Sequence, residues 1–197
     1  MTVGNARFDF DDLYHAVLNR LADGRYPLGG RISVKQLADS LNVSPTPLRE
    51  ILSRLVGRGL VEERRSEGYY LARLDPPGLA DLYRLHGDCV DLALRSLLHF
   101  PPPQEPANDA WAVLASLVRA SERAILQSVQ AYIDERLRIV RRCERQVCDE
   151  AAAISSWEAA RYQDDLGLLR KSVARFHKTR IAASRPIIEL ANARALS

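Results

Sequence analysis

Long apolar runs are missing from this sequence, and their absence excludes one class of protein. No uninterrupted apolar stretch approaches the ~20 residues that a helix needs to cross a bilayer. The opening residues, MTVGNARFDFDD, lack the apolar segment of a secretory signal. We therefore expect a protein with no membrane partner and a cytoplasmic location.

Cysteine is also scarce. Cys89, Cys143 and Cys148 are the only three, and an odd count argues against a disulfide scaffold and for a reducing compartment. Cys143 and Cys148 are five residues apart, so on one helix they point to different faces. Buried thiols are the expected state, with a redox switch as the alternative.

Signatures of catalysis are absent as well. The sequence has no Gly-rich phosphate loop, no nucleophile elbow and no Cys–His pair at a recognisable spacing. The pair Asp164-Asp165 is followed by helical sequence, which favours surface charge over a catalytic dyad. We therefore expect that the chain is not an enzyme.

Glycine and proline are unevenly distributed, and they divide the chain. Neither occurs from Ala107 to Leu166, whereas turn residues punctuate the first 75 positions. The segment Asp75-Pro76-Pro77-Gly78 marks the boundary. This pattern predicts a domain of short elements over residues 1–75. It predicts a second, all-helical domain of long helices over residues 76–197.

Helical spacing and capping residues predict three helices in the first domain. The first runs over about Asp11–Asp23, with apolar residues on one face. The second begins at Ser33, which has capping-box spacing with Gln36. The third begins with Ser44 as its cap and Pro45 at its first position, where a missing N–H costs nothing.

Two β-prone runs follow the third helix. Residues 60–65 and 69–72 are joined by a turn that contains Gly68, which predicts a hairpin. Three helices with a tight turn between the last two, followed by a hairpin, are the layout of a winged helix-turn-helix. The predicted fold is therefore mainly α, with an N-terminal winged helix-turn-helix and a C-terminal helical bundle.

Charge placement supports DNA as a partner more than the total charge does. The net charge of +3 is small, but nine Lys and Arg face six Asp and Glu between Arg20 and Glu67. A helix that starts at Ser44 fits the major groove, and Arg49 one turn later can bond guanine O6 and N7. The residues expected to contact DNA are Lys35, Ser44, Pro45, Thr46, Arg49, Arg64, Arg65 and Gly68.

Each of these residues has a simpler interpretation. Arg49 alone is typical of a solvated surface arginine, and Ser44 alone is typical of any helix cap. The Arg64-Arg65 pair alone is typical of a solvated face. Their joint order and spacing is what favours DNA binding.

The segment Leu37–Glu50, with Ser44-Pro45-Thr46-Pro47-Leu48-Arg49-Glu50 at its end, resembles the GntR family of regulators. The resemblance extends over Leu13–Leu74. It implies that operator DNA is bound by Lys35, Ser44, Thr46, Arg49 and the Gly68 wing tip. The chain departs from the family at Pro45, where an arginine is usual, and this puts the family's usual operator sequence in doubt.

The C-terminal half more weakly resembles the helical effector domain of the FadR-type branch, through Leu79–Leu85 and Phe176–Ile187. The resemblance implies an effector of the organic acid class. His86 stands where the family has Arg.

His177 matches a metal-ligating histidine of that branch, but Val173 stands where the family has Asp. A second alignment puts Asp134 at the aspartate and Arg138 at a histidine. Either way the ligand set is incomplete, so we expect no cofactor and keep His177 as the weak metal candidate.

These observations predict a dimeric, ligand-responsive repressor that reads a palindromic operator in double-stranded DNA. The long helices after Ala107 are expected to supply the dimer interface. The alternative is a helical interaction protein or small-molecule-binding protein whose winged helix no longer binds DNA.

Overall fold

The computed structural model describes residues 9–101 and 109–194, which separate into two compact units. The first contains residues 9–74 with residues 138–142 and 189–194, and the second contains Asp75–Leu137 and Cys143–Ile188. Within these described ranges, none of the helices combines the length and the apolar character needed to span a membrane.

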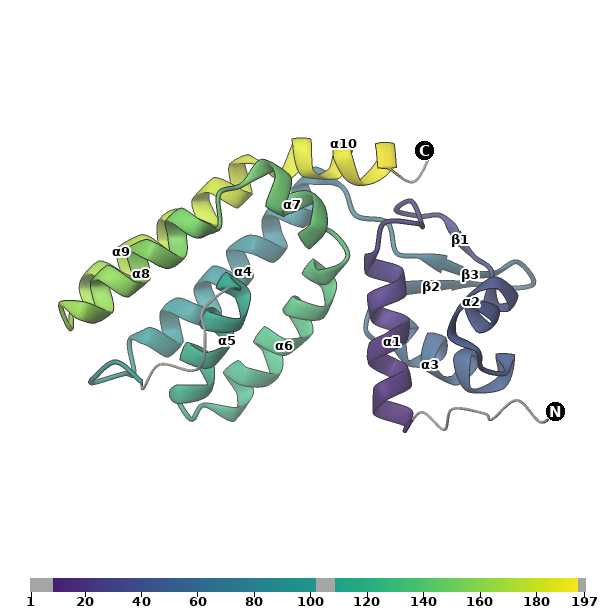
Figure 1. The fold of residues 1–197 in the computed structure, drawn as a ribbon, viewed down its shortest axis with the longest axis horizontal. Coiled ribbons are helices and arrows are strands. Elements are labelled where there is room, and N and C mark those ends of the chain that lie inside the picture. Colours follow the sequence, from purple (N-terminus) through teal and green to yellow (C-terminus); the bar gives the residue numbers. More distant parts are fainter. Residues whose placement is uncertain (1–8, 102–108, 195–197) are drawn as a thin grey trace. The chain divides into compact units, whose positions relative to one another are not determined.

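The first unit has three helices and a small antiparallel sheet (Figure 1). The elements are α1 (Phe10–Ala22), β1 (Arg31–Ile32), α2 (Val34–Leu41), α3 (Pro45–Gly57), β2 (Val61–Arg64) and β3 (Gly68–Leu71). The predicted helices and hairpin are confirmed. The two-residue strand β1 was not predicted; it pairs with β3, so the sheet order is β1-β3-β2.

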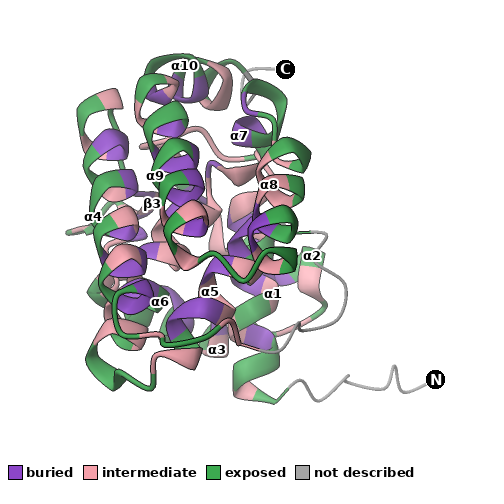
Figure 2. Ribbon diagram, turned by 90° about the vertical axis from the view of Figure 1, so that its left-hand side faces the viewer, coloured by how far each residue is buried: buried purple, intermediate pink, exposed green. Residues whose placement is uncertain are grey.

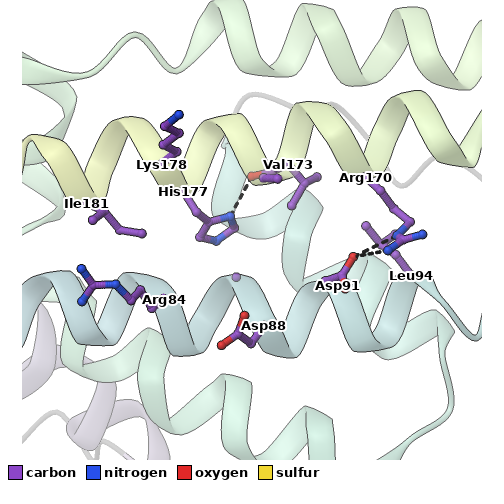
Figure 3. Close-up of a pocket in the computed structure, with 11 residues that line it drawn as sticks. Arg84, Asp88, Asp91, Leu94, Arg170, Val173, His177, Lys178 and Ile181 are labelled. Carbon is purple, nitrogen blue, oxygen red and sulfur yellow. Dashed lines mark hydrogen bonds and ion pairs between the residues drawn. The ribbon is translucent and has the colours of Figure 1, made fainter.

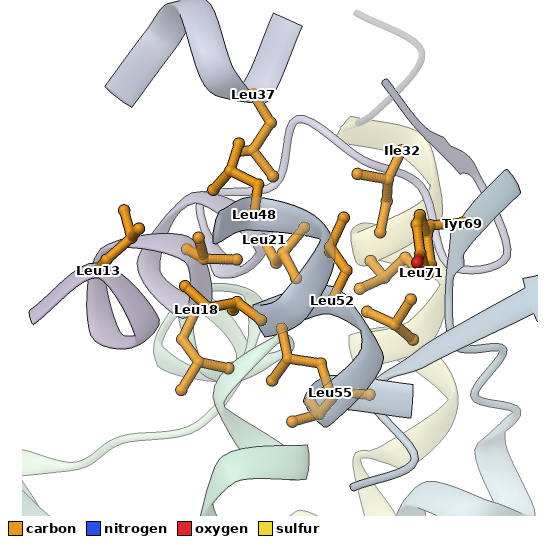
Figure 4. Close-up of a cluster of buried hydrophobic side chains, with 14 of the residues drawn as sticks. Leu13, Leu18, Leu21, Ile32, Leu37, Leu48, Leu52, Leu55, Tyr69 and Leu71 are labelled. Carbon is orange, nitrogen blue, oxygen red and sulfur yellow. The ribbon is translucent and has the colours of Figure 1, made fainter. Parts of the chain in front are cut away.

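A leucine-rich core holds these elements together (Figure 4). Leu13, Leu18 and Leu21 project from one face of α1, as their helical spacing predicted. They pack with apolar residues of α2, α3 and the sheet. The most completely buried of these partners are Leu37, Leu48, Ile51, Leu52, Leu55 and Leu71. This packing fixes α3 by its apolar face and leaves its other face outside.

The second unit is entirely helical over its described residues. The helices after residue 75 are α4 (Pro76–Leu94), α5 (Ala110–Ala120), α6 (Ala124–Arg138), α7 (Arg141–Val147), α8 (Ala151–Tyr162), α9 (Leu166–Ala182) and α10 (Ser184–Arg194). The last residue of α6, the start of α7 and the end of α10 belong to the first unit, and the rest belong to the second. The prediction of an all-helical second half is confirmed. Within it, α4 packs against α9 and α5, and α8 packs against α9.

The prediction of long helices after Ala107 is wrong in detail. Four helices of 7 to 15 residues fill the stretch that lacks Gly and Pro. Breaks occur where ordinary residues adopt the left-handed conformation, at Glu122 (φ 56°) and Asp164 (φ 50°). Tertiary packing sets these turns, because neither residue type requires one.

Buried and exposed residues share the helices α4 and α9, as Figure 2 shows. The buried residues of α4 include Leu79, Tyr83, His86 and Val90. Those of α9 include Phe176, His177 and Arg180. The interior of this unit therefore contains aromatic and ionisable groups as well as aliphatic ones.

Candidate nucleic-acid interface

The turn between α2 and α3 positions the candidate recognition helix. Ser33 caps α2, and its Oγ accepts the backbone N–H of Gln36 at 3.3 Å. Asn42 ends α2 in the left-handed conformation (φ 54°), and its N–H donates to the carbonyls of Ala38 and Asp39. Asn tolerates this conformation better than most residues, so the chain can reverse within two residues before α3 begins.

The start of α3 is exposed and unusually poor in backbone donors. Ser44 occupies the cap position, but its side chain makes no capping hydrogen bond. The expected capping role of this hydroxyl is therefore wrong for this structure. Pro45 and Pro47 have no N–H, so Ser44 and Thr46 keep the backbone donors of the first turn. The hydroxyls of Ser44 and Thr46 lie beside them, both on exposed residues.

Arg49 lies one turn further along, on the outer face of α3. It is exposed, and among the described residues it has no hydrogen bond or ion pair. Arg54 on the next turn lies 4.2 Å above the ring of Phe10, so its guanidinium is already engaged. Ser53 is linked to Tyr69 of β3 at 3.3 Å between hydroxyls, which ties α3 to the sheet.

Two of the predicted arginines lie at the hairpin turn, and their contacts differ. Arg64 stacks 3.8 Å above the ring of Tyr70 and pairs with Glu62 at 3.5 Å. Arg65 is exposed at the turn. Gly68 has φ +106°, and a Cβ built there would meet nothing within 4 Å. Conformation, not space, therefore explains a glycine at this position.

Lys35 completes the predicted set. It is exposed in the first turn of α2, two residues after the cap Ser33. All eight predicted residues thus belong to α2, α3 or the β2–β3 hairpin. Within residues 9–101 and 109–194, Arg64 is the one member of this set whose charged group is held by other side chains.

The second unit contains a histidine pair that the sequence did not predict. The rings of His86 and His177 are both buried, and His86 Nδ1 lies 2.9 Å from His177 Nε2. His177 Nδ1 donates to the Val173 carbonyl at 2.8 Å, so its Nε2 accepts from His86. On the far side of His86, Nε2 lies 3.4 Å from Asp134.

This arrangement uses both ring nitrogens of His177, the weak metal candidate. Burial, followed by the neighbouring His86, lowers the pKa of His177 to about 3. Over the residues that the structure describes, no group of three or more His, Cys, Asp or Glu could hold a metal ion. The pair is 91 residues apart in sequence, so no local spacing could have signalled it.

A buried carboxylate joins four helices nearby. Glu144 of α7 accepts from Arg180 at 2.6 Å and from the Trp111 indole at 3.1 Å, both through Oε1. Its Oε2 accepts the hydroxyl of Tyr83 at 2.9 Å. Burial, and then the charge of Glu144, raises the pKa of Tyr83. Among the residues that the structure describes, the buried Nη2 of Arg180 has no hydrogen-bond partner.

A groove of about 430 Å³ lies between α4 and α9 (Figure 3). Its apolar lining includes Leu94, Val173 and Ile181. One end is closed by an ion pair at 2.8 Å that crosses from Asp91 of α4 to Arg170 of α9. The remaining lining residues are Arg84, Gly87, Asp88, Ala174, His177 and Lys178. The Asp88 carboxylate is turned away from α9 in this view.

The cysteines are all buried and none forms a disulfide. Burial raises the pKa of the Cys89 and Cys148 thiols. Burial and a raised pKa both disfavour the reactive thiolate, so these cysteines fit a packing role better than a redox role.

Geometry defines the first unit as a winged helix-turn-helix domain: two helices joined by a tight turn, with an exposed second helix and a β-hairpin wing. The model of the bacterial regulatory proteins of the gntR family matches residues 10–71. Residues 10–71 therefore form a winged helix-turn-helix that matches the model of this family.

Curated relatives match part of the chain. The Nta operon transcriptional regulator of Aminobacter aminovorans is 37% identical over 79 residues, which are 40% of this chain and 38% of that protein. An HTH-type transcriptional regulator in an unstable DNA locus of Streptomyces ambofaciens is 33% identical over 107 residues, or 54% and 44% of the two chains. The chain thus matches less than half of either relative.

Solved structures extend the likeness in fold to the second unit. E. coli McbR/YncC superimposes with a TM-score of 0.64 at 19% identity, covering 93% of this chain and 98% of that one. A putative GntR regulator from Rhodococcus sp. RHA1 gives 0.59 at 15% identity, covering 88% and 98%. The helical second unit therefore has known structural counterparts.

Proposed function

We propose that this chain is a non-enzymatic, cytoplasmic transcription regulator that binds double-stranded operator DNA as a homodimer. The observation that carries the proposal is the exposed leading end of α3, with Arg49 unengaged on its outer face. An arginine there can make a bidentate contact with guanine in the major groove. Repression through a palindromic operator is part of the proposal.

The other predicted residues have distinct proposed roles. Lys35, at the start of α2, binds phosphate and sets the register of α3 on the duplex. The hydroxyls of Ser44 and Thr46 donate to phosphate or base edges. Arg65 and the Gly68 turn contact the flanking backbone, whereas Arg64 first has to leave Glu62 and Tyr70. Pro45 gives van der Waals contact and no hydrogen bond.

The test begins with selection of preferred duplexes from a random 30-base-pair pool by the full-length protein. Affinity for the enriched duplex is then measured by fluorescence anisotropy at several salt concentrations. We expect Arg49→Ala to lower this affinity by about 5- to 150-fold, and to leave affinity for random duplex nearly unchanged. Arg175→Ala, which removes an exposed arginine from α9, is the matched control and is expected to have no effect.

Lys35→Ala separates backbone contact from base reading. Loss of one phosphate contact weakens binding about equally for all sequences and reduces the salt slope by about 1. Absence of any enriched duplex, or binding without salt dependence, contradicts the proposal and favours a protein-interaction role for the winged helix.

The proposal includes an organic acid effector in the groove between α4 and α9. Its volume of about 430 Å³ lies in the range of small-ligand sites, roughly 300–1,000 Å³. Apolar Val173 and Ile181 and cationic Arg84 line it, a combination suited to a carboxylate with an aliphatic or aromatic body. Arg84 would have to leave Asp81, which it now contacts at 2.6 Å. Lys178 also borders the groove, but its amine points away from α4 in Figure 3 and would have to turn inward.

Differential scanning fluorimetry with millimolar monocarboxylates of increasing chain length tests this part. Binding to the folded state raises the melting temperature, and Arg84→Ala with Lys178→Ala should abolish the shift. Arg185→Ala, an exposed arginine of α10, should retain it. A panel without any shift, or a shift unaffected by the groove substitutions, contradicts an effector here.

A further inference from the structure

One face of α4 exposes two large apolar side chains. Leu85 is 48% exposed and Leu92 is 47% exposed, although most apolar residues of this helix face inward. They are seven residues apart, so they lie on the same side of the helix. With three charged neighbours they form what we call the α4 seam: Asp81, Leu85, Asp88, Leu92 and Arg95.

The spacing of the α4 seam is that of an interhelical contact. Its members follow steps of four, three, four and three residues, which is the repeat that lines up knobs along a packed helix pair. All except the two half-exposed leucines are charged. A helix face that stays in solvent would be expected to have polar residues at Leu85 and Leu92, which are equivalent positions of this repeat.

The α4 seam is complementary to itself when reversed. A two-fold axis near residues 88 and 89 places Leu85 of one copy against Leu92 of the other. It also places Asp81 opposite Arg95, twice. Parallel packing would instead set Asp81 against Asp81 and Arg95 against Arg95. Isologous contacts of this kind are the usual basis of homodimers.

We infer that α4 packs antiparallel against α4 of a second copy of this chain, through the α4 seam, in place of the helices after Ala107 that were expected from the sequence to form the dimer interface. The inference specifies the homodimer of the proposed function, but its readout is oligomeric state and does not require DNA. Within one chain Asp81 is held by Arg84 at 2.6 Å and Arg95 by Asp91 at 2.7 Å. Both charged groups are therefore presented at the surface of α4, where a partner can share them.

Asp88 is the one unfavourable member. It lies next to the two-fold axis, so the two copies bring like charges together, which weakens an association. Asp88→Asn should therefore tighten the dimer, which distinguishes this arrangement from one in which α4 stays in solvent.

Sedimentation of the full-length protein from about 0.1 to 100 μM tests the inference. Wild type is expected to show a concentration-dependent dimer, and Leu85→Asp with Leu92→Asp is expected to raise its dissociation constant on the order of 100-fold. Ile125→Asp on α6, where the side chain is 77% exposed, is the matched control and should leave the dimer intact. Circular dichroism verifies that each variant is folded.

Charge exchange provides a second measurement that does not depend on the leucine variants. Asp81→Arg and Arg95→Asp should each weaken the dimer by about tenfold, and the double variant should restore it. The two positions are 14 residues apart, about 21 Å along the helix, so rescue cannot come from within one chain. A monomeric wild type, a dimer insensitive to the leucine changes, or the absence of rescue would overturn the inference, while DNA binding by Arg49 is scored separately.

Discussion

At the scale of single residues, the most consequential feature is the buried Glu144–Arg180 pair. Their side chains are 0% and 2% exposed, and Oε1 to Nε is 2.6 Å. Removing one partner of such a pair leaves a buried charge without compensation. We expect Glu144→Gln to reduce the free energy of unfolding by about 3–5 kcal/mol, measured by urea denaturation.

The double variant Glu144→Gln with Arg180→Met tests whether charge compensation is the cause. It should be clearly more stable than the sum of the two single changes predicts, because Met leaves no charge behind. Arg25→Gln, which removes an exposed ion pair with Asp23 at 3.1 Å, should cost no more than about 1 kcal/mol. Equal costs at the buried and exposed pairs would contradict this account.

His177 gives a pH dependence with a defined sign. The folded protein keeps this ring neutral because its pKa is about 3, against 6.5 for the ordinary side chain. Between pH 3 and pH 6.5 this ring is protonated in the unfolded chain and neutral in the folded chain. Stability is therefore present above pH 6.5 and is lost as the pH falls toward 3.

Urea midpoints from pH 8 to pH 5 measure this effect. Wild type should lose stability below pH 6.5 more steeply than His177→Gln, by up to about 1.4 kcal/mol per pH unit. His86 is hydrogen-bonded to His177, so the difference reports on the histidine pair. Identical slopes would show that His177 does not titrate differently on folding.

Features of a residue that depend on the local sequence could be predicted, and contacts that depend on tertiary packing could not. The exposure of Arg49 follows from its place on α3, opposite Leu48, Ile51 and Leu52, which helical periodicity gives directly. The contact of His86 with His177 depends on how α4 packs against α9. Nothing in the spacing of those two histidines encodes that packing.

At the scale of elements, strong local signals identified the helices and the hairpin of the first unit. The strand β1 was not predicted because two residues are too few to show a periodic pattern, and its pairing with Tyr69 and Tyr70 depends on the tertiary fold. The helix breaks at Glu122 and Asp164 were also not predicted, for a related reason. Glu122 is not of a residue type that favours the left-handed conformation, and Asp164 is of a type that adopts it only occasionally, so neither residue predicts a break.

Asn42 is the element-scale position with the clearest energetic cost. It holds the α2–α3 turn at φ 54°, where a residue with a branched Cβ is strained. Asn42→Val should lower the free energy of unfolding by about 1–2 kcal/mol, while Asn42→Gly should be close to neutral. Thermal unfolding of both variants measures the contrast, and similar losses would mean that the Asn side chain, not the backbone, matters.

At the scale of the whole molecule, the comparisons do not define how copies of this chain assemble. The family model matches residues 10–71, and the solved structure with a similar fold is only 19% identical. The assembly is therefore argued from the surfaces of this protein. One exposed helix reaches only a few base pairs, so a second copy must provide the rest of the contact. If the proposed dimer holds two α3 helices at a fixed separation, the operator must repeat that separation.

Half-site spacing then becomes the decisive variable. Inserting five base pairs at the centre of an enriched palindrome rotates one half-site by about half a helical turn, since a turn is about 10–10.5 base pairs. Affinity should fall to the level of random duplex, and ten inserted base pairs should restore part of it. Leu85→Asp with Leu92→Asp should bind all three duplexes with the same low affinity, because a monomer engages one half-site at a time. Equal binding of the three duplexes by wild type would mean that each copy reads DNA alone.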